Sequence, residues 1–270
     1  MKSWVTMVRI LALVVLPIAC ACGGGGGGDD FGDDAPSPDA PAGATVTRTY
    51  QQGVSGYSGT RSVGISTYGG LGNVGEYNAN GMTFADGLND WCTGTGLSPG
   101  AYAEVWLLRF EELGVPAGAR VVSATLTIHG HGDGAVGEHF VGQYLAAPWF
   151  GDTPISCAGC SNSPVGWRYR DGSGSPWGAL GASAEGTDVR AGRSFRLPER
   201  GDVGTGSSPQ PLAASLDPAE VQAWLDGSNY GVRIIAGVNG VHMGYVPAQR
   251  DPGGRPAEMR PKLELTYAVP

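Results

Sequence analysis

The sequence has few charged residues and no concentration of positive charge. Charged side chains make up 16% of the 270 residues, and the formal net charge is −8. Five of the acidic residues lie within residues 29–39, so the rest of the chain is only mildly acidic. A surface without a basic stripe offers no electrostatic attraction to nucleic acid or to anionic lipid. We therefore expect neither as a partner of the folded part.

The sequence also lacks the motifs of nucleophilic hydrolases. No G-x-S-x-G string occurs, and no serine stands in a recognisable turn before a helix. Glu111 and Glu112 are adjacent, so in a strand they would point to opposite faces, which does not suit a shared sugar substrate. We therefore predict no catalytic residues and a protein that is not an enzyme.

The chain lacks an N-terminal apolar run long enough to span a bilayer comfortably. Residues 10–18 are apolar, follow Lys2 and Arg9, and precede the string Ala-Cys-Ala-Cys. This order is typical of an export signal. The sequence therefore predicts a protein of the cell envelope, on the extracytoplasmic side, or otherwise a secreted one.

Small residues directly before a cysteine resemble a bacterial lipobox, in which that cysteine carries the lipid. Ala19 and Ala21 stand before Cys22 at the positions that matter. Cys20 is the alternative, although Pro17 stands at the equivalent upstream position. We predict a lipoprotein-type signal and anchor over residues 1–22, so that the lipid is the chain's only contact with the membrane.

A tether is expected between this anchor and the folded part. Residues 23–28 are all glycine, and an acidic, proline-containing stretch with almost no apolar residue follows. Such composition is typical of a flexible, then partly extended, linker. We assign residues 23–43 to the tether and residues 44–270 to a single domain.

Apolar and polar residues alternate most clearly in residues 104–130. In the second half of this stretch apolar residues occupy every other position from Val122 to Ile128, which is typical of a half-buried strand. The first half is apolar on most of both faces, and a glycine- and proline-containing reversal separates the two. The remaining strands are predicted at residues 45–50, 61–67, 82–84, 135–145, 195–197, 232–236, 241–246 and 262–267.

One helix is predicted, at residues 217–227. Asp217 is placed to cap it, Pro218 takes the first helical position, Glu220 stands three residues beyond the cap, and Gly227 ends it. Many short strands, long loops at residues 68–100 and 146–191, and one short connecting helix indicate an all-β fold. We predict a jelly-roll-like β-sandwich.

Five strings together resemble the DNRLRE-type domain, also described as carbohydrate-binding module family 96. They are TRTYQQGVSGYSGT, LLRFEELGVPAGARVVSATLTI, GWRYRDGSGSPWGALGA, VQAWLDGSNYGVRI and RPKLELTY, in that order. The resemblance covers residues 44–270 and implies a non-catalytic β-sandwich of bacterial and archaeal surface proteins, with polysaccharide binding known for some members. Arg61-Ser62 and the SCAGC insertion depart from the pattern, so it implies a fold and a class of function but no ligand site.

The cysteines of the domain are disulfide candidates, because thiols outside the cytoplasm tend to pair. Cys92 can bridge to Cys157 or Cys160, or the last two can pair directly. A C-x-x-C redox centre normally begins a helix, and no helix is expected after this one.

No metal or other cofactor is predicted, with structural calcium as the remaining alternative. His129, His131 and His139 match no known zinc spacing. Asp86 and Asp90 offer oxygen ligands in a loop, but they fit no defined calcium motif.

Aromatic residues in the second long loop are the best candidates for a binding site. A sugar ring stacks on an exposed aromatic face with polar groups nearby. Trp167 and Trp177 are expected to pin the loop to the sandwich instead. The predicted ligand-binding residues are Trp149, Phe150, Arg168, Tyr169, Arg170 and Asp171.

These observations favour a non-catalytic cell-envelope lipoprotein domain that binds polysaccharide. The alternative is a structural or adhesive surface domain that contacts a protein and no sugar.

Overall fold

A computed structural model gives the fold of the domain. It describes residues 43–66, 77–78, 91–93, 104–132, 137, 139–149, 169–171, 175–199, 209–237, 243–245, 248 and 256–270. All of these belong to the unit Asp34–Pro270. The predicted signal, both candidate lipid-bearing cysteines and nearly all of the predicted tether lie outside the described residues.

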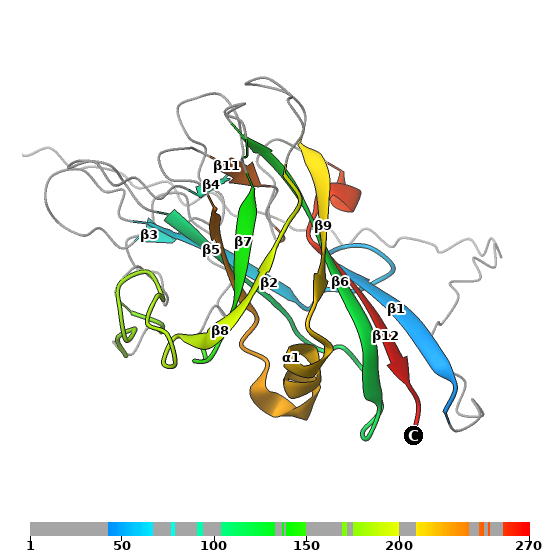
Figure 1. The fold of residues 1–270 in the computed structure, drawn as a ribbon. Helices are drawn as coiled ribbons and strands as arrows, with labels where there is room; N and C mark the ends of the chain where they lie inside the picture. The colour runs from blue at the N-terminus through cyan, green and yellow to red at the C-terminus, as the bar shows by residue number, and fades with distance from the viewer. Residues whose placement is uncertain are drawn as a thin grey trace, which may run out of the picture. The chain divides into compact units, whose positions relative to one another are not determined.

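The described residues form two six-stranded sheets in which every named strand pair is antiparallel, so the predicted all-β sandwich is confirmed (Figure 1). The jelly-roll connectivity stays a prediction. We call the two sheets sheet A and sheet B.

Sheet A is built around its longest strand, β6. Along most of its length β6 pairs with β12 on one side and with β9 on the other, while β1 adds to β12. At its far end β6 pairs with β11, which pairs with β4. The strands are β1 (Thr45–Gln51), β12 (Lys262–Ala268), β6 (Arg120–Gly132), β9 (Gln210–Leu216), β11 (Met243–Tyr245) and β4 (Trp91–Thr93).

Sheet B has the strand order β3-β2-β5-β10-β7-β8. Its strands are β3 (Tyr77–Asn78), β2 (Thr60–Ser66), β5 (Glu104–Phe110), β10 (Val232–Ala236), β7 (Phe140–Leu145) and β8 (Val189–Arg196). The central stretch predicted from alternation therefore supplies β5 to sheet B and β6 to sheet A. Its reversal is a crossover between the sheets, and the two strands do not pair with each other.

The first core lies between the sheets. Inward-facing residues of β12, Leu263, Leu265 and Tyr267, are fully buried, as their alternation predicts. Sheet B contributes residues such as Trp106 and Phe140 from the opposite side. Two apolar faces that exclude water between them are what holds a sandwich together.

A second core covers the outer face of sheet B. Leu107 of β5 and Ile65 of β2 point into it, and residues 176–189 supply the cover. We call residues 176–189 the covering segment. Because sheet B is buried on both faces, β5 is apolar on both of its sides, as its sequence predicts.

The predicted helix forms, but only its first part is α-helical. In α1 (Pro218–Ala223) the side chain of Asp217 accepts from a backbone N–H at 2.9 Å, which confirms the predicted cap. A π-helical turn, η1 (Trp224–Ser228), follows, and within it Gly227 has a φ of +101°. A short 3-10 helix, η2 (Ala257–Met259), precedes β12.

Glu220 does not act as the cap partner that its spacing suggests. Its buried carboxylate pairs with Arg190 of β8, at 2.9 Å, and more loosely with Arg193, at 3.6 Å. This ion pair links α1 to the edge of sheet B. The expected capping box is therefore wrong, because a guanidinium from another element occupies the carboxylate.

Several strands differ from the prediction. β7 begins at Phe140 and not at residue 135, the short strands β3 and β4 were not predicted, and the strand predicted at residues 82–84 lies outside the described residues. β9 was not predicted, although Leu212, Ala214 and Leu216 alternate inward. Its alanines and its proline have low strand propensity, so the period-two signal is weak. β8 begins six residues before the predicted strand, because its glycine- and arginine-containing start is an exposed sheet edge with little apolar content.

Candidate functional site

Trp149 does not belong to an exposed aromatic site. Its side chain is 0% exposed and packs in the second core. Its Nε1 donates to the carbonyl oxygen of Tyr230 at 2.7 Å, and the Arg109 guanidinium carbon lies 5.0 Å from the ring centroid. The prediction that this ring stacks on a sugar is therefore wrong, because the covering segment encloses it with sheet B.

The neighbouring candidates form a tight turn. The ring of Tyr169 is 38% exposed, and its backbone bridges to Pro176. The N–H of Arg170 donates to Ser175 O at 2.9 Å, and Ser175 N donates to the Asp171 carboxylate at 3.1 Å. Of the predicted site, the structure therefore brings these three residues together.

Asp171 helps to close this turn, and Tyr169 is a large ring that solvent can reach. Phe150, Arg168 and Trp167 lie outside the described residues. Trp177 is buried in the second core, which confirms that it pins the loop to the sandwich.

Of the predicted disulfide and calcium positions, one is described and the rest lie outside the described residues. Cys92 lies in β4, where it pairs across from Gly244 of β11, and its side chain is not described. Cys157, Cys160, Asp86 and Asp90 lie outside the described residues, so the disulfide and calcium alternatives stay predictions.

His129 lies half-buried on β6, and this burial lowers its pKa. His139 is bonded locally, with Nδ1 2.8 Å from the carbonyl oxygen of Gly137. Within the described ranges, no three His, Cys, Asp or Glu side chains are grouped so that they could hold a metal ion.

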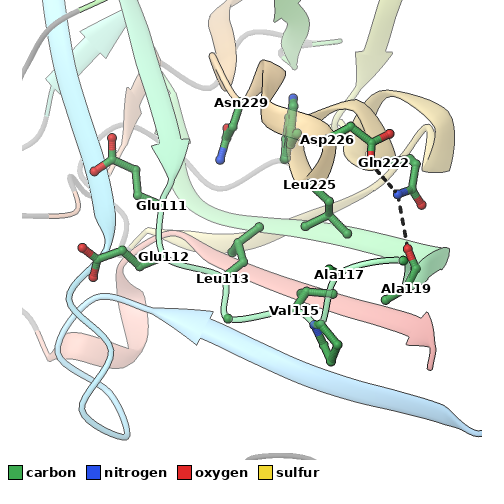
Figure 2. A pocket seen from close by; sticks show the side chains of 14 residues that line it. Glu111, Glu112, Leu113, Val115, Ala117, Ala119, Gln222, Leu225, Asp226 and Asn229 are labelled. Atoms are coloured by element: carbon green, nitrogen blue, oxygen red, sulfur yellow. Dashed lines mark hydrogen bonds between the residues drawn. The ribbon is translucent and has the colours of Figure 1, made fainter. Parts of the chain in front are cut away.

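The adjacency of Glu111 and Glu112 suggested that they point to opposite faces of a strand. The structure shows that they do not. β5 ends at Phe110, and Glu112 has a φ of +52° in the left-handed region. Figure 2 shows both carboxylates on the same side of the loop. Glu111 is held by two guanidinium groups, Arg61 at 3.0 Å and Arg109.

A cavity of about 420 Å³ lies where this loop meets the helix, and we call it the crossover cavity (Figure 2). One wall is the β5–β6 connection, and the other is α1 with η1. The lining residues are Glu111, Glu112, Leu113, Gly114, Val115, Pro116, Ala117, Gly118, Ala119, Gln222, Trp224, Leu225, Asp226 and Asn229.

Two tyrosines fix the loop wall of the crossover cavity. Tyr50 of β1 donates its hydroxyl to Leu113 O at 2.5 Å, and Tyr57 donates to Glu111 O at 2.7 Å. Their rings meet edge to face at 5.3 Å. Burial raises the pKa of Tyr50 to about 12 and raises that of Tyr57 as well, so both phenols remain donors at neutral pH.

Gln222 joins the two walls. Its Nε2 donates to Ala119 O at 3.3 Å and to the Asp226 carboxylate at 3.2 Å, while its Oε1 accepts from Val121 N at 2.9 Å. Asn229 makes a second link, because its Nδ2 donates to Phe110 O at 2.5 Å. The walls are therefore positioned by hydrogen bonds that leave Gln222 no free polar atom.

Two buried polar atoms of the lining have no hydrogen-bond partner among the described residues. They are Oδ1 of Asn229, an acceptor, and Nε1 of Trp224, a donor. Burying such a group without a partner costs about 1–3 kcal/mol. Both atoms are closed to solvent, so a ligand in the cavity would reach them only if the lining moved.

No local pattern in the sequence indicates this cavity. Its walls lie about a hundred positions apart in the chain, and the loop shows only the glycine and proline of a turn. Gln222, Asp226 and Asn229 are ordinary polar residues on a short helix and its end.

A scan against models of protein families finds no match for this chain, and a search of curated proteins finds no relative. The resemblance to the DNRLRE-type domain therefore stays a prediction. Across the ranges that the structure describes, no helix has the length and apolar character needed to cross a membrane.

Proposed function

We propose that this chain carries a non-catalytic, glycan-binding β-sandwich displayed on the bacterial cell envelope. The observation that carries the proposal is the crossover cavity, whose lining includes the exposed carboxylates of Glu112 and Asp226. Sugar hydroxyls can donate to such carboxylates, whereas an apolar ligand offers them no hydrogen bond.

The remaining lining supports the same class of ligand. Leu113, Val115 and Leu225 offer apolar surface for the C–H groups of a sugar ring. Glu112 and Asp226 are exposed carboxylates at the rim, and such groups accept strong hydrogen bonds from hydroxyls. The volume of the cavity lies within the usual range of small-ligand sites.

The ion pairs of Glu111 support the non-catalytic part of the proposal. Glycoside hydrolysis needs two carboxylates that face one bond, one of them free to give up or take a proton. Glu111 is instead engaged by Arg61 and Arg109 at the end of β5. Its role is to hold the strand end in place.

The binding site is tested by filling the crossover cavity. Purified full-length chain is titrated with soluble hexasaccharides of glucose, N-acetylglucosamine and mannose, and heat of binding is measured. We expect Ala117→Trp to weaken binding by about tenfold or more, the equivalent of roughly 1.4 kcal/mol. Ala191→Trp on β8, which is also exposed, is the matched control and should bind like the natural chain.

Unchanged binding by Ala117→Trp would remove the crossover cavity as the site. Binding to none of the sugars, on a glycan array as well, would defeat the glycan proposal and favour the adhesive alternative with a protein partner.

The membrane anchor is tested by metabolic labelling with a fatty acid. Label is expected on the natural chain and should be lost on Cys22→Ser, or on Cys20→Ser if that cysteine is the acceptor. Label that survives loss of both cysteines would contradict the anchor.

A further inference from the structure

As far as the described residues show, the outer face of sheet A is open, unlike that of sheet B. On sheet B the corresponding face is covered by the second core. On sheet A the outward residues of β1, Thr45, Thr47 and Thr49, are all exposed. No described element covers them.

Hydroxyl residues continue across the neighbouring strands in register. Thr49 lies opposite Glu264, which lies opposite Thr125, which lies opposite Ser215. These four positions belong to β1, β12, β6 and β9, which lie side by side in Figure 1. One row of side chains therefore crosses four strands.

A second row runs beside the first. Thr47 lies opposite Thr266, which lies opposite Ser123, and the hydroxyls of Thr47 and Thr266 are 2.8 Å apart. Neighbouring strands are about 4.8 Å apart, and same-face residues along a strand about 6.7 Å, so the hydroxyls form a regular array. We call this surface the hydroxyl face.

Strand propensity alone does not account for this composition. Threonine is favoured in strands, but that preference does not set the balance of charge on the face. Within the hydroxyl face the charges are Glu264 and Lys262, which are of opposite sign and two residues apart on β12. Arg120 adds a cation only at the start of β6. The rows are therefore close to neutral, and they suit a neutral partner.

We propose that the hydroxyl face binds neutral polysaccharide whose chains lie side by side in an insoluble surface, such as cellulose or chitin particles. This inference rests on the proposed glycan-binding function and adds a second, extended contact to the crossover cavity. Sugar hydroxyls and threonine hydroxyls both donate and accept, so the two arrays can bond in either direction.

A rigid polymer surface fits this face better than a single dissolved chain does. Replacing hydrogen bonds to water by one hydrogen bond between two hydroxyls contributes little binding free energy. Many such bonds must therefore form together. A dissolved chain loses conformational freedom when it lies flat, whereas chains already ordered in a particle lose almost none. Four strands span about 14 Å between the outer two, enough to contact more than one chain.

The crossover cavity and the hydroxyl face share strand β1. The outward threonines of β1 belong to the hydroxyl face, while Arg48 and Tyr50 point inward and donate to the loop of the crossover cavity. The two surfaces can nevertheless be changed separately, because their side chains lie on opposite faces of the strand.

The test measures depletion of the full-length chain from solution by washed cellulose and chitin particles. In Thr47→Val/Thr125→Val the shape and strand propensity remain and two hydroxyls are lost. We expect about tenfold weaker partition onto particles and unchanged titration with soluble hexasaccharides. Thr47→Ser/Thr125→Ser keeps the hydroxyls and should partition like the natural chain.

The matched control is Thr187→Val, an exposed threonine of the covering segment, which should leave partition unchanged. Equal losses in this control would overturn the inference, as would full partition by the Thr47→Val/Thr125→Val variant. If the natural chain binds soluble sugars but neither kind of particle, the inference about the hydroxyl face is wrong and the proposed function stands. Failure to bind either form would defeat both.

Discussion

Arg109 and Trp149 stabilise each other in the second core. The guanidinium carbon lies 5.0 Å from the ring centroid, and Nη1 donates to the carbonyl oxygen of Trp149 at 3.3 Å. A cation over an indole ring is attracted by the ring's negative face, more strongly where water is excluded. The same guanidinium pairs with Glu111, so one side chain connects the second core to the lining of the crossover cavity.

Replacing Trp149 tests this structural role. Trp149→Ala removes a fully buried ring and its hydrogen bond to Tyr230, and we expect it to lower the free energy of unfolding by about 3–5 kcal/mol. Urea unfolding followed by circular dichroism measures the change.

Tyr169→Ala is the matched aromatic control, because that ring is 38% exposed. We expect this variant to stay within about 0.5 kcal/mol of the natural chain. Equal losses in the two variants would contradict the assignment of one ring to the core and the other to the surface.

At the scale of elements, the covering segment is organised by one buried carboxylate. Asp188 is 1% exposed and accepts from the N–H groups of Gly178, Ala179 and Ala184 at 2.7, 2.9 and 3.0 Å. Arg233 of β10 donates to Gly181 O at 2.8 Å and anchors the same segment to sheet B. Backbone donors in a loop need such partners when the loop is buried.

Asp188→Asn tests this anchor with almost no change in size. The amide places N–H groups where the backbone N–H groups already point, so at least one donor loses its acceptor. We expect a loss of about 2–4 kcal/mol and faster hydrogen exchange in the covering segment.

Glu185→Gln removes a charge from an exposed position in the same segment and should change the free energy of unfolding by less than about 0.5 kcal/mol. Slow exchange in the Asp188→Asn variant would show that the segment does not depend on this carboxylate.

Local sequence patterns predicted those elements whose own residues show the periodicity or the cap. Alternation identified β6 and β12, and Asp217 with its following proline identified the start of α1. At the start of β6 the predicted face is wrong for Val122, which is 40% exposed, because the pairing with β12 is irregular there and Val121 is buried instead. The burial of β5 on both sides also followed from its own residues.

Features that depend on distant segments were not predictable in this way. The burial of Trp149 depends on the covering segment, and the crossover cavity depends on residues 111–119 meeting α1 and η1. The separation of β5 and β6 into different sheets depends on which partners each strand finds, namely β2 and β10 for one and β12 and β9 for the other. The periodicity of one strand does not determine which other strand it pairs with.

At the scale of the whole domain, buried tyrosines make stability depend on alkaline pH. Burial raises the pKa of Tyr50 and of Tyr144 from 10.0 to about 12 in each case, and raises that of Tyr57 as well. Above pH 10 the unfolded chain gives up these protons before the folded chain does. Their stabilising contribution is therefore complete below pH 10 and is lost between about pH 10 and 12.

Arg233 acts in the opposite sense, because burial lowers its pKa to about 10. Three tyrosines outweigh this single group, so we expect the free energy of unfolding to fall by a few kcal/mol between pH 9.5 and 11.5. Urea titrations at a series of pH values measure the slope. Tyr144→Phe should reduce it, and a flat or rising profile would contradict the assignment.

The pairing of β1 with β12 has a consequence for the order of events during folding. β12 lies between β1 and β6, and its register with β1 runs from Thr45 opposite Ala268 to Gln51 opposite Lys262. Among the described strands, β1 is the first to leave the ribosome, and it has no partner until β12, more than two hundred residues later, has been made. Because the two strands are so far apart in the sequence, we expect closure of sheet A to be a late and slow step of folding. Until then an unpaired strand edge rich in threonine is open to pairing with other chains.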